Sequence, residues 1–281
     1  MTETLQHVRY VVISNPTTAV SGAGFVALIL IAVFGPPLAP YDPLVTNVSN
    51  ALKAPSMLHW FGTDQLGRDV FSRVITATRL DLSIAIAAVF IAWLVGSIIG
   101  AAIGFWGGIA DRIASRLVDV LMAFPLFVLA MALVAALGNT IENVVYATAL
   151  INLPFYIRTA RAEVGLRRNA GYIAAARMAG SSSSELIFRF LIPNVLPILT
   201  VQISLNLGWA ILNAASLSFI GLGVRPPAPE WGLMVAEGAT FILTGQWWLV
   251  FFPAMFLVLA VFCFNLVGDG LRDILDPRRR T

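Results

Sequence analysis

Five side chains that could form hydrogen bonds to a solute recur along one apolar stretch near residue 210. They follow one another at steps of three and four, which places them on one face of an α-helix. They are Gln202, Asn206, Trp209, Asn213 and Ser216. Amide groups are costly in lipid, so this face must meet protein or water. A path for peptide backbones, which need donors and acceptors, and a polar contact between helices explain it equally well.

The residue types that most enzymes use are scarce. The two histidines, His7 and His59, form no metal-binding pair, and the single Cys263 excludes an internal disulfide. No Gly-x-Ser-x-Gly elbow is present. A phosphate-binding loop needs G-x-x-x-x-G-K-[ST], but the only lysine, Lys53, stands in "LKAP". We therefore expect a non-catalytic chain with no catalytic residues, no metal site and no bound cofactor.

The composition is that of a membrane protein. Of the 281 residues, 58% are hydrophobic and only 12% are charged, and the mean hydropathy is +0.84. A soluble domain carries about twice that charged fraction. The net charge of +3 comes almost entirely from clustered arginines, which bear on membrane orientation and not on nucleic-acid binding.

Six stretches are apolar enough to cross a bilayer, which takes about 20 helical residues. They are 19–39, 82–105, 117–138, 140–158, 195–221 and 246–267. Backbone groups must be satisfied inside lipid, so the sequence predicts an all-α integral membrane protein with a six-helix bundle. The core domain is expected over 82–267.

Arginine placement predicts the topology. The segments 106–116 and 159–194 and the tail after residue 267 are rich in arginine, which puts both termini, 1–18 and 268–281, in the cytoplasm. The segment 40–81 would be extracytoplasmic although it also holds basic residues, and we expect internal ion pairs among Asp64, Arg68 and Asp69. Three tryptophans are expected to anchor the bundle at the lipid interface. They are Trp231, Trp247 and Trp248.

A glycine stripe marks the second stretch. Gly96, Gly100 and Gly104 are four apart on one helix face, where another backbone can approach closely. Packing inside the bundle is the simpler explanation, and a subunit interface is the other.

An unusually polar insertion, 159–194, separates the fourth and fifth stretches. "YIAAARMAG" favours a helix that Gly180 ends in a left-handed cap. Ser184 can cap a second helix, which Pro193 and Pro197 are expected to stop before the fifth span. This helix–turn–helix could contact another protein or rest on lipid headgroups.

The insertion resembles the cytoplasmic loop of ABC-importer permeases, with the pattern E-A-A-x3-G-x9-I-x-L-P. Ala174, Ala175 and Ala176 hold the first three positions and Gly180 holds the glycine. The closing positions are Phe190, Ile192 and Pro193. Ala174 replaces the usual glutamate, which removes a charge from the expected contact with the ATPase.

Longer blocks extend the resemblance to the C-type permease subunit of the dipeptide/oligopeptide/nickel branch. They are "HWFGTDQLGRDVFSRV", "RLVDVLMAFP", "ASLSFIGLGVRPPAPEWG" and "FNLVGDGLRDILDPR". The resemblance implies the type I ABC-importer (MetI-like) fold in a bacterial or archaeal cell membrane. It implies a heterodimer with a second homologous permease, two cytoplasmic ATPases that bind ATP and Mg²⁺, and an extracytoplasmic substrate-binding protein.

The resemblance also implies that helix 172–184 couples the bundle to the ATPases and that short peptides cross it. Arg177 and Glu185 are candidate polar partners of the ATPase beside the alanines and Gly180. Nickel or another small solute remains open as cargo. A stand-alone secondary transporter is the alternative class, although the six stretches hold no charged residue near their centres.

Overall fold

The computed structural model describes residues 16–275, and most of them are helical; the longest connection between helices is the segment 39–69. The predicted tails 1–18 and 268–281 fall partly outside the described residues. The helices are α2 (Pro16–Leu38), α3 (Val70–Trp106), α4 (Gly108–Ala123), α5 (Leu126–Leu137), α6 (Ile141–Arg167), α7 (Gly171–Met178), α8 (Ser183–Glu185), α9 (Ile192–Phe219), α10 (Trp231–Ala239) and α11 (Trp248–Leu275). Short helical turns occupy Val48–Asn50, Leu186–Leu191 and Ile242–Thr244.

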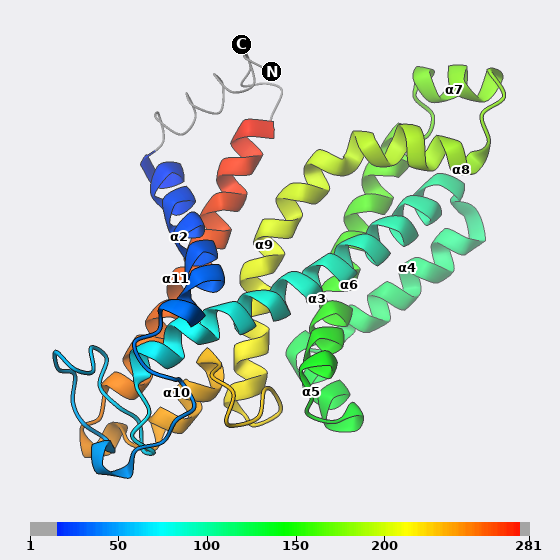
Figure 1. Ribbon diagram of the computed structural model, residues 1–281. Coiled ribbons are helices and arrows are strands. Elements are labelled where there is room, and N and C mark those ends of the chain that lie inside the picture. The colour runs from blue at the N-terminus through cyan, green and yellow to red at the C-terminus, as the bar shows by residue number, and fades with distance from the viewer. Residues whose placement is uncertain (1–15, 276–281) are drawn as a thin grey trace.

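The chain passes repeatedly between two sides of the molecule, along α2, α3, the pair α4–α5, α6, α9 and α11 (Figure 1). Among residues 16–275, four helices are long and apolar enough to cross a membrane, and the α4–α5 pair would add a fifth. The 27-residue α6 is more polar, because it carries Arg158, Arg161 and Glu163 toward its end. These passes coincide in order with the six predicted stretches.

Two predicted boundaries were wrong. Helix α3 begins at Val70 and not at residue 82, because Asp69 caps it by accepting a hydrogen bond from the Ser72 backbone N–H at 2.8 Å. The predicted span 117–138 is not one helix but two, α4 and α5, which meet at an angle of 89°. Pro125 explains the break, since the residue before a proline avoids helical angles and Phe124 is extended.

The glycine stripe of α3 packs against α6 inside the bundle. A Cβ added at Gly96 would lie 2.7 Å from the Cβ of Tyr156, and one at Gly104 would lie 2.5 Å from the carbonyl oxygen of Arg161. Real Cβ atoms do not come so close to backbone, so only glycine permits this helix separation. The stripe is therefore occupied by the chain's own α6.

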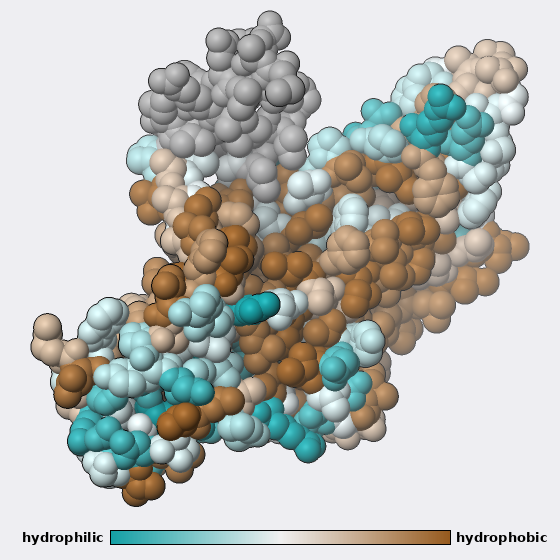
Figure 2. Space-filling model, in the orientation of Figure 1, coloured by the Kyte–Doolittle hydropathy of each residue, from teal (hydrophilic) through white to brown (hydrophobic). Residues whose placement is uncertain are grey.

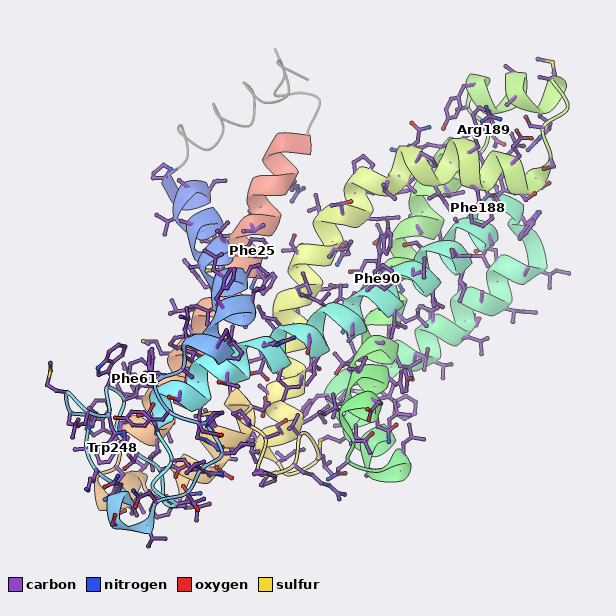
Figure 3. The ribbon with its side chains drawn as sticks, viewed as in Figure 1. Phe25, Phe61, Phe90, Phe188, Arg189 and Trp248 are labelled. Carbon is purple, nitrogen blue, oxygen red and sulfur yellow. The ribbon has the colours of Figure 1, made fainter. Side chains whose placement is uncertain are left out.

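The side of the molecule opposite α7 is formed by the segment 39–69 and α10 (Figure 1). Hydrophilic residues gather over this end and over the α7 end, while hydrophobic residues cover much of the surface between them (Figure 2). The Phe61 ring stacks on Phe252 with centroids 3.9 Å apart, and Phe61 and Trp248 mark this junction in Figure 3. The segment 39–69 is thus fixed to the start of α11.

A buried ion cluster also holds this end together. The Asp64 carboxylate lies 2.5 Å from Arg68 Nε and 3.6 Å from Arg73 Nε, and Glu237 of α10 lies 3.3 Å from Arg68. The predicted internal pairing of Asp64 and Arg68 is confirmed. Asp69 pairs instead with His59, whose Nδ1 is 2.9 Å from the carboxylate.

The prediction that three tryptophans anchor the bundle in the interface was wrong for two of them. Trp231 is completely buried and Trp248 nearly so, whereas Trp247 is half exposed. The indole N–H of Trp231 donates to the Val74 carbonyl oxygen of α3 at 3.1 Å. That of Trp248 donates to the Thr63 carbonyl oxygen at 3.2 Å. Both buried indoles therefore have protein partners, one in α3 and one in the segment 39–69.

Candidate functional site

Helix α7 projects from one end of the molecule and exposes most of its surface (Figure 1). Ile173 is its one buried residue, and Ala176 packs partly against the core. Ala174 and Ala175 are exposed, and Met178 exposes 85% of its surface. The exposed surface therefore combines the small Ala174 and Ala175 with the larger Tyr172, Arg177 and Met178, and sequence reasoning did not single out Met178.

The turn after α7 depends on Gly180. Its φ of +88° lies in the left-handed region, as the sequence predicted, and the space around it is open. The Ser181 N–H donates to the Ala176 carbonyl oxygen at 3.1 Å, which closes the end of the helix. The next helix is capped by Ser182 and not by Ser184 as predicted. Ser182 Oγ accepts from the Glu185 N–H at 3.3 Å.

The two candidate polar partners of an ATPase both have partners within the chain. The Arg177 guanidinium lies over the Phe105 ring, 5.9 Å from its centroid, and so ties α7 to the end of α3. The Glu185 carboxylate accepts a hydrogen bond from Arg189 at 3.0 Å, one turn along. Arg189 and Phe188 are labelled at this end of the molecule in Figure 3. The Arg177 and Glu185 side chains themselves remain accessible at the surface.

The second helix of the insertion does not stop before the fifth span, so the prediction for Pro193 and Pro197 was wrong. Residues Ser183–Phe219 form one continuous 37-residue helix. A π-helical segment, Leu186–Leu191, precedes Pro193. Pro193 follows directly on this segment, where the backbone already departs from ordinary α-helical hydrogen bonding, and the Asn194 side-chain amide donates to the Phe190 carbonyl oxygen at 2.6 Å. The α7 end is thereby connected without a break to the opposite side.

The five polar residues of α9 differ in environment. Asn206 is buried, Trp209 is 62% exposed, and Gln202, Asn213 and Ser216 lie between these extremes. Gln202 Nε2 donates to Asn206 Oδ1 at 3.0 Å, and the Asn213 and Ser216 side chains donate to carbonyl oxygens one turn earlier in α9. Among these five residues, Gln202 and Asn206 bond to each other, while Trp209, Asn213 and Ser216 are at least partly exposed.

A groove of about 350 Å³ continues this face. Leu212, Ser216 and Phe219 line it from α9, with Phe127 of α5 and Val258 of α11 on its other walls. The helical stripe was visible in the sequence, but the apolar groove required the positions of α5 and α11.

The bundle, its exposed α7 and its long connecting helix define a membrane permease subunit of an ABC importer, and family comparisons agree. The model of the "binding-protein-dependent transport system inner membrane component" matches residues 96–281. The "N-terminal TM domain of oligopeptide transport permease C" matches residues 5–55. The chain belongs to the family of binding-protein-dependent transport system inner membrane components.

Individual relatives cover nearly the whole chain. It is 43% identical over 264 residues to a probable D,D-dipeptide transport system permease protein, DdpC, of Escherichia coli strain K12, covering 94% of this chain and 88% of that protein. It is 42% identical to the dipeptide transport system permease protein DppC of Alkalihalophilus pseudofirmus, covering 91% of this chain and 84% of that protein. It is 39% identical to the glutathione transport system permease protein GsiD of Pectobacterium atrosepticum, covering 92% of this chain and 87% of that protein.

Solved structures show the same fold. An inward-facing structure of the MetNI methionine ABC transporter aligns with a TM-score of 0.58 and 18% identity, covering 72% of this chain and 96% of that one. The chain is therefore a multi-pass membrane protein with the type I importer permease fold, and proteins of its family are membrane permeases and not the catalytic subunits.

Proposed function

We propose that this chain forms half of the pathway through which an ATP-driven importer takes up short peptides. The supporting observation on cargo is that relatives of 39–43% identity are named for D,D-dipeptide, dipeptide and glutathione transport. The polar face of α9 is suited to such a cargo, because amide and hydroxyl groups can pair with peptide N–H and C=O groups without holding a fixed charge.

The exposed face of α7 is the proposed contact with two cytoplasmic ATPases, which bind ATP and Mg²⁺. Ala174, Ala175, Arg177 and Glu185 lie on or beside it, and Gly180 sets the turn that presents it. Movement of α7 would be passed on through the continuous helix Ser183–Phe219, one end of which carries the polar face. The unbroken course of this helix is the observation that supports the proposed mechanism.

The proposed topology places α7 and both chain ends in the cytoplasm. The start of α2 and the end of α11 lie toward the same side of the molecule as α7 (Figure 1), which is consistent with this placement. The segment 39–69 and α10 would then face an extracytoplasmic substrate-binding protein. A second, homologous permease subunit would supply the other half of the pathway.

An α7 variant tests the coupling proposal. Ala175→Trp enlarges the exposed face without touching the core, and Ala110→Trp is the matched control, an exposed alanine in α4 on the same side. The complete complex is purified from mild detergent, and its bound subunits and ATP turnover are measured. We expect Ala175→Trp to lose the ATPases while Ala110→Trp retains them. Retention of full ATPase binding and turnover by Ala175→Trp would show that α7 is not the contact.

Uptake into vesicles tests the cargo. The complex, with its binding protein, is supplied with labelled dipeptides, and Asn213→Leu is compared with Thr200→Val on an earlier turn of α9. We expect ATP-dependent dipeptide uptake that Asn213→Leu reduces several-fold and Thr200→Val leaves unchanged. ATP-dependent uptake of nickel but not of peptide would show that the cargo is nickel. Uptake driven by an ion gradient without ATP would favour the stand-alone secondary transporter.

A further inference from the structure

Two carboxyl groups meet in the interior at the end of the molecule opposite α7. Asp81 of α3 and Glu230, the N-cap of α10, are 4% and 1% exposed, and both carboxyl groups accept hydrogen bonds from the first backbone N–H groups of α10. They lie 149 positions apart in the sequence, so the contact joins α3 directly to the segment 221–239 that follows α9.

No basic group compensates the pair in the part of the chain that the structure describes. The nearby Arg73 is engaged with Asp64 and Glu237, and Arg79 and Arg225 are exposed. Helix α9 carries no charged residue, and Glu237 is the other titratable group of α10. Two adjacent buried carboxylates without a countercharge are strongly unfavourable, as in enzymes whose paired carboxyls hold one proton between them.

The hydrogen bonds indicate which group is ionised. Glu230 accepts from the Gly232 N–H at 3.0 Å and the Leu233 N–H at 2.6 Å, in the first turn of a helix, where a carboxylate is favoured. Asp81 accepts one backbone hydrogen bond, from the Trp231 N–H at 3.1 Å. A proton on the other Asp81 oxygen would be donated to Glu230 and would satisfy both side chains.

We propose that Asp81 and Glu230 share a single proton and that this acid–carboxylate pair is an alkaline-sensitive lock between α3 and the segment 221–239. The Ser218 hydroxyl at the end of α9 accepts from the Val224 N–H at 3.1 Å, which ties the same segment to α9. The pair and this bond together join the segment 221–239 to α3 and to the end of the long helix Ser183–Phe219.

The direction of the pH effect follows from the burial of the pair. Burial without a countercharge raises the pH at which the pair releases its shared proton, because the loss of that proton would leave two adjacent buried carboxylates. The folded state therefore holds a proton that the unfolded chain releases near its ordinary carboxyl pKa. Stability from the lock is complete below that ordinary pKa and is lost as pH rises through the raised value.

Infrared spectroscopy of the purified complex tests the shared proton directly. We expect the carbonyl stretching band of a protonated carboxylic acid at neutral pH, and its loss at alkaline pH. Asp81→Asn removes the acid but keeps a donor to Glu230, so the band should be absent. Asp42→Asn, in an exposed loop, should retain it. Absence of the band from the wild type, or its persistence in Asp81→Asn, would overturn the proposal.

Thermal unfolding at a series of pH values tests the lock without measuring transport. The unfolding temperature of the wild type should fall between neutral and alkaline pH, and this fall should be smaller in Asp81→Asn. Unchanged pH dependence in the variant would contradict the lock. If Asp81→Asn does not fold, the wild-type infrared titration decides alone. Neither measurement depends on what the complex transports, so failure of the peptide proposal would leave both interpretable.

Discussion

Gly100 of α3 lies directly on the backbone of Ile157 in α6: a Cβ added at the glycine would stand 2.5 Å from the Ile157 carbonyl oxygen. No rotamer change can relieve such a contact, because both groups belong to helix backbones. The separation of α3 and α6 is thus set by the absence of a side chain at this position.

Replacement of Gly100 by alanine should therefore force the two helices apart. We expect a loss of about 1–3 kcal/mol in unfolding free energy, typical of overpacking. Gly165→Ala in α6 is the control, since nothing lies within 4 Å of its added Cβ. That variant should be about 0.4–1 kcal/mol more stable, because it restricts the unfolded chain. Thermal unfolding in detergent measures both, and equal effects would contradict the close contact.

Trp231 should behave as a core residue. Trp231→Phe removes the hydrogen bond to Val74 and leaves a void, so we expect an unfolding temperature several degrees lower. Trp247→Phe, at a half-exposed position, should change it little. If both indoles anchored the protein in the lipid interface, the two variants would show similar effects that depend on the surrounding lipid.

The Asp64 carboxylate should be essential to the buried ion cluster. Asp64→Asn leaves Arg68 and Arg73, which are 3% and 1% exposed, with only Glu237 as a countercharge. We expect a loss of about 3 kcal/mol, since breaking a buried pair strands a charge. Asp42→Asn, exposed in the same segment, should be nearly neutral. Chemical denaturation compares them, and a neutral Asp64→Asn would show that water already solvates the arginines.

The turn at Gly180 should tolerate a larger side chain but not a β-branched one. Its surroundings are open, so only the positive φ penalises a substitution. Gly180→Asn should retain most ATP-driven uptake, and Gly180→Val should lose much of it by changing how α7 is presented. Gly171→Ala, within α7 and also unobstructed, is the control. Equal activity in Gly180→Val would mean that the turn does not position α7.

The sequence predicts best those features that depend on local composition or on a single residue type. Six apolar stretches coincide with the passes of the chain, and Gly180 ends α7 because few other residues adopt its backbone angles. Hydropathy cannot distinguish lipid from protein as the neighbour of an apolar residue. The burial of Trp231 depends on α3, whose Val74 lies 157 positions away. The meeting of Asp81 and Glu230 was invisible for the same reason.

Helix boundaries depended on interactions too local for hydropathy to report. Asp69 caps the start of α3 within a polar segment. The extended backbone of Phe124 breaks a stretch that hydropathy alone shows as one continuous apolar span. At Pro193 the sequence indicated a stop, yet the chain continues as a helix, since the π-helical segment before it already changes the backbone hydrogen bonding there.

The π-helical segment Leu186–Leu191 has a consequence for how this chain can vary in length. A π-helical turn accommodates one residue more than an α-helical turn, and each residue turns an α-helix by about 100°. Deletion of a single residue here could restore ordinary winding without breaking the helix. It would keep the polar face of α9 in phase with α7, whereas the same deletion in an α-helical turn would rotate that face by about 100°. Single-residue deletions should therefore be tolerated within Leu186–Leu191 and not in the α-helical turns of α9 that follow.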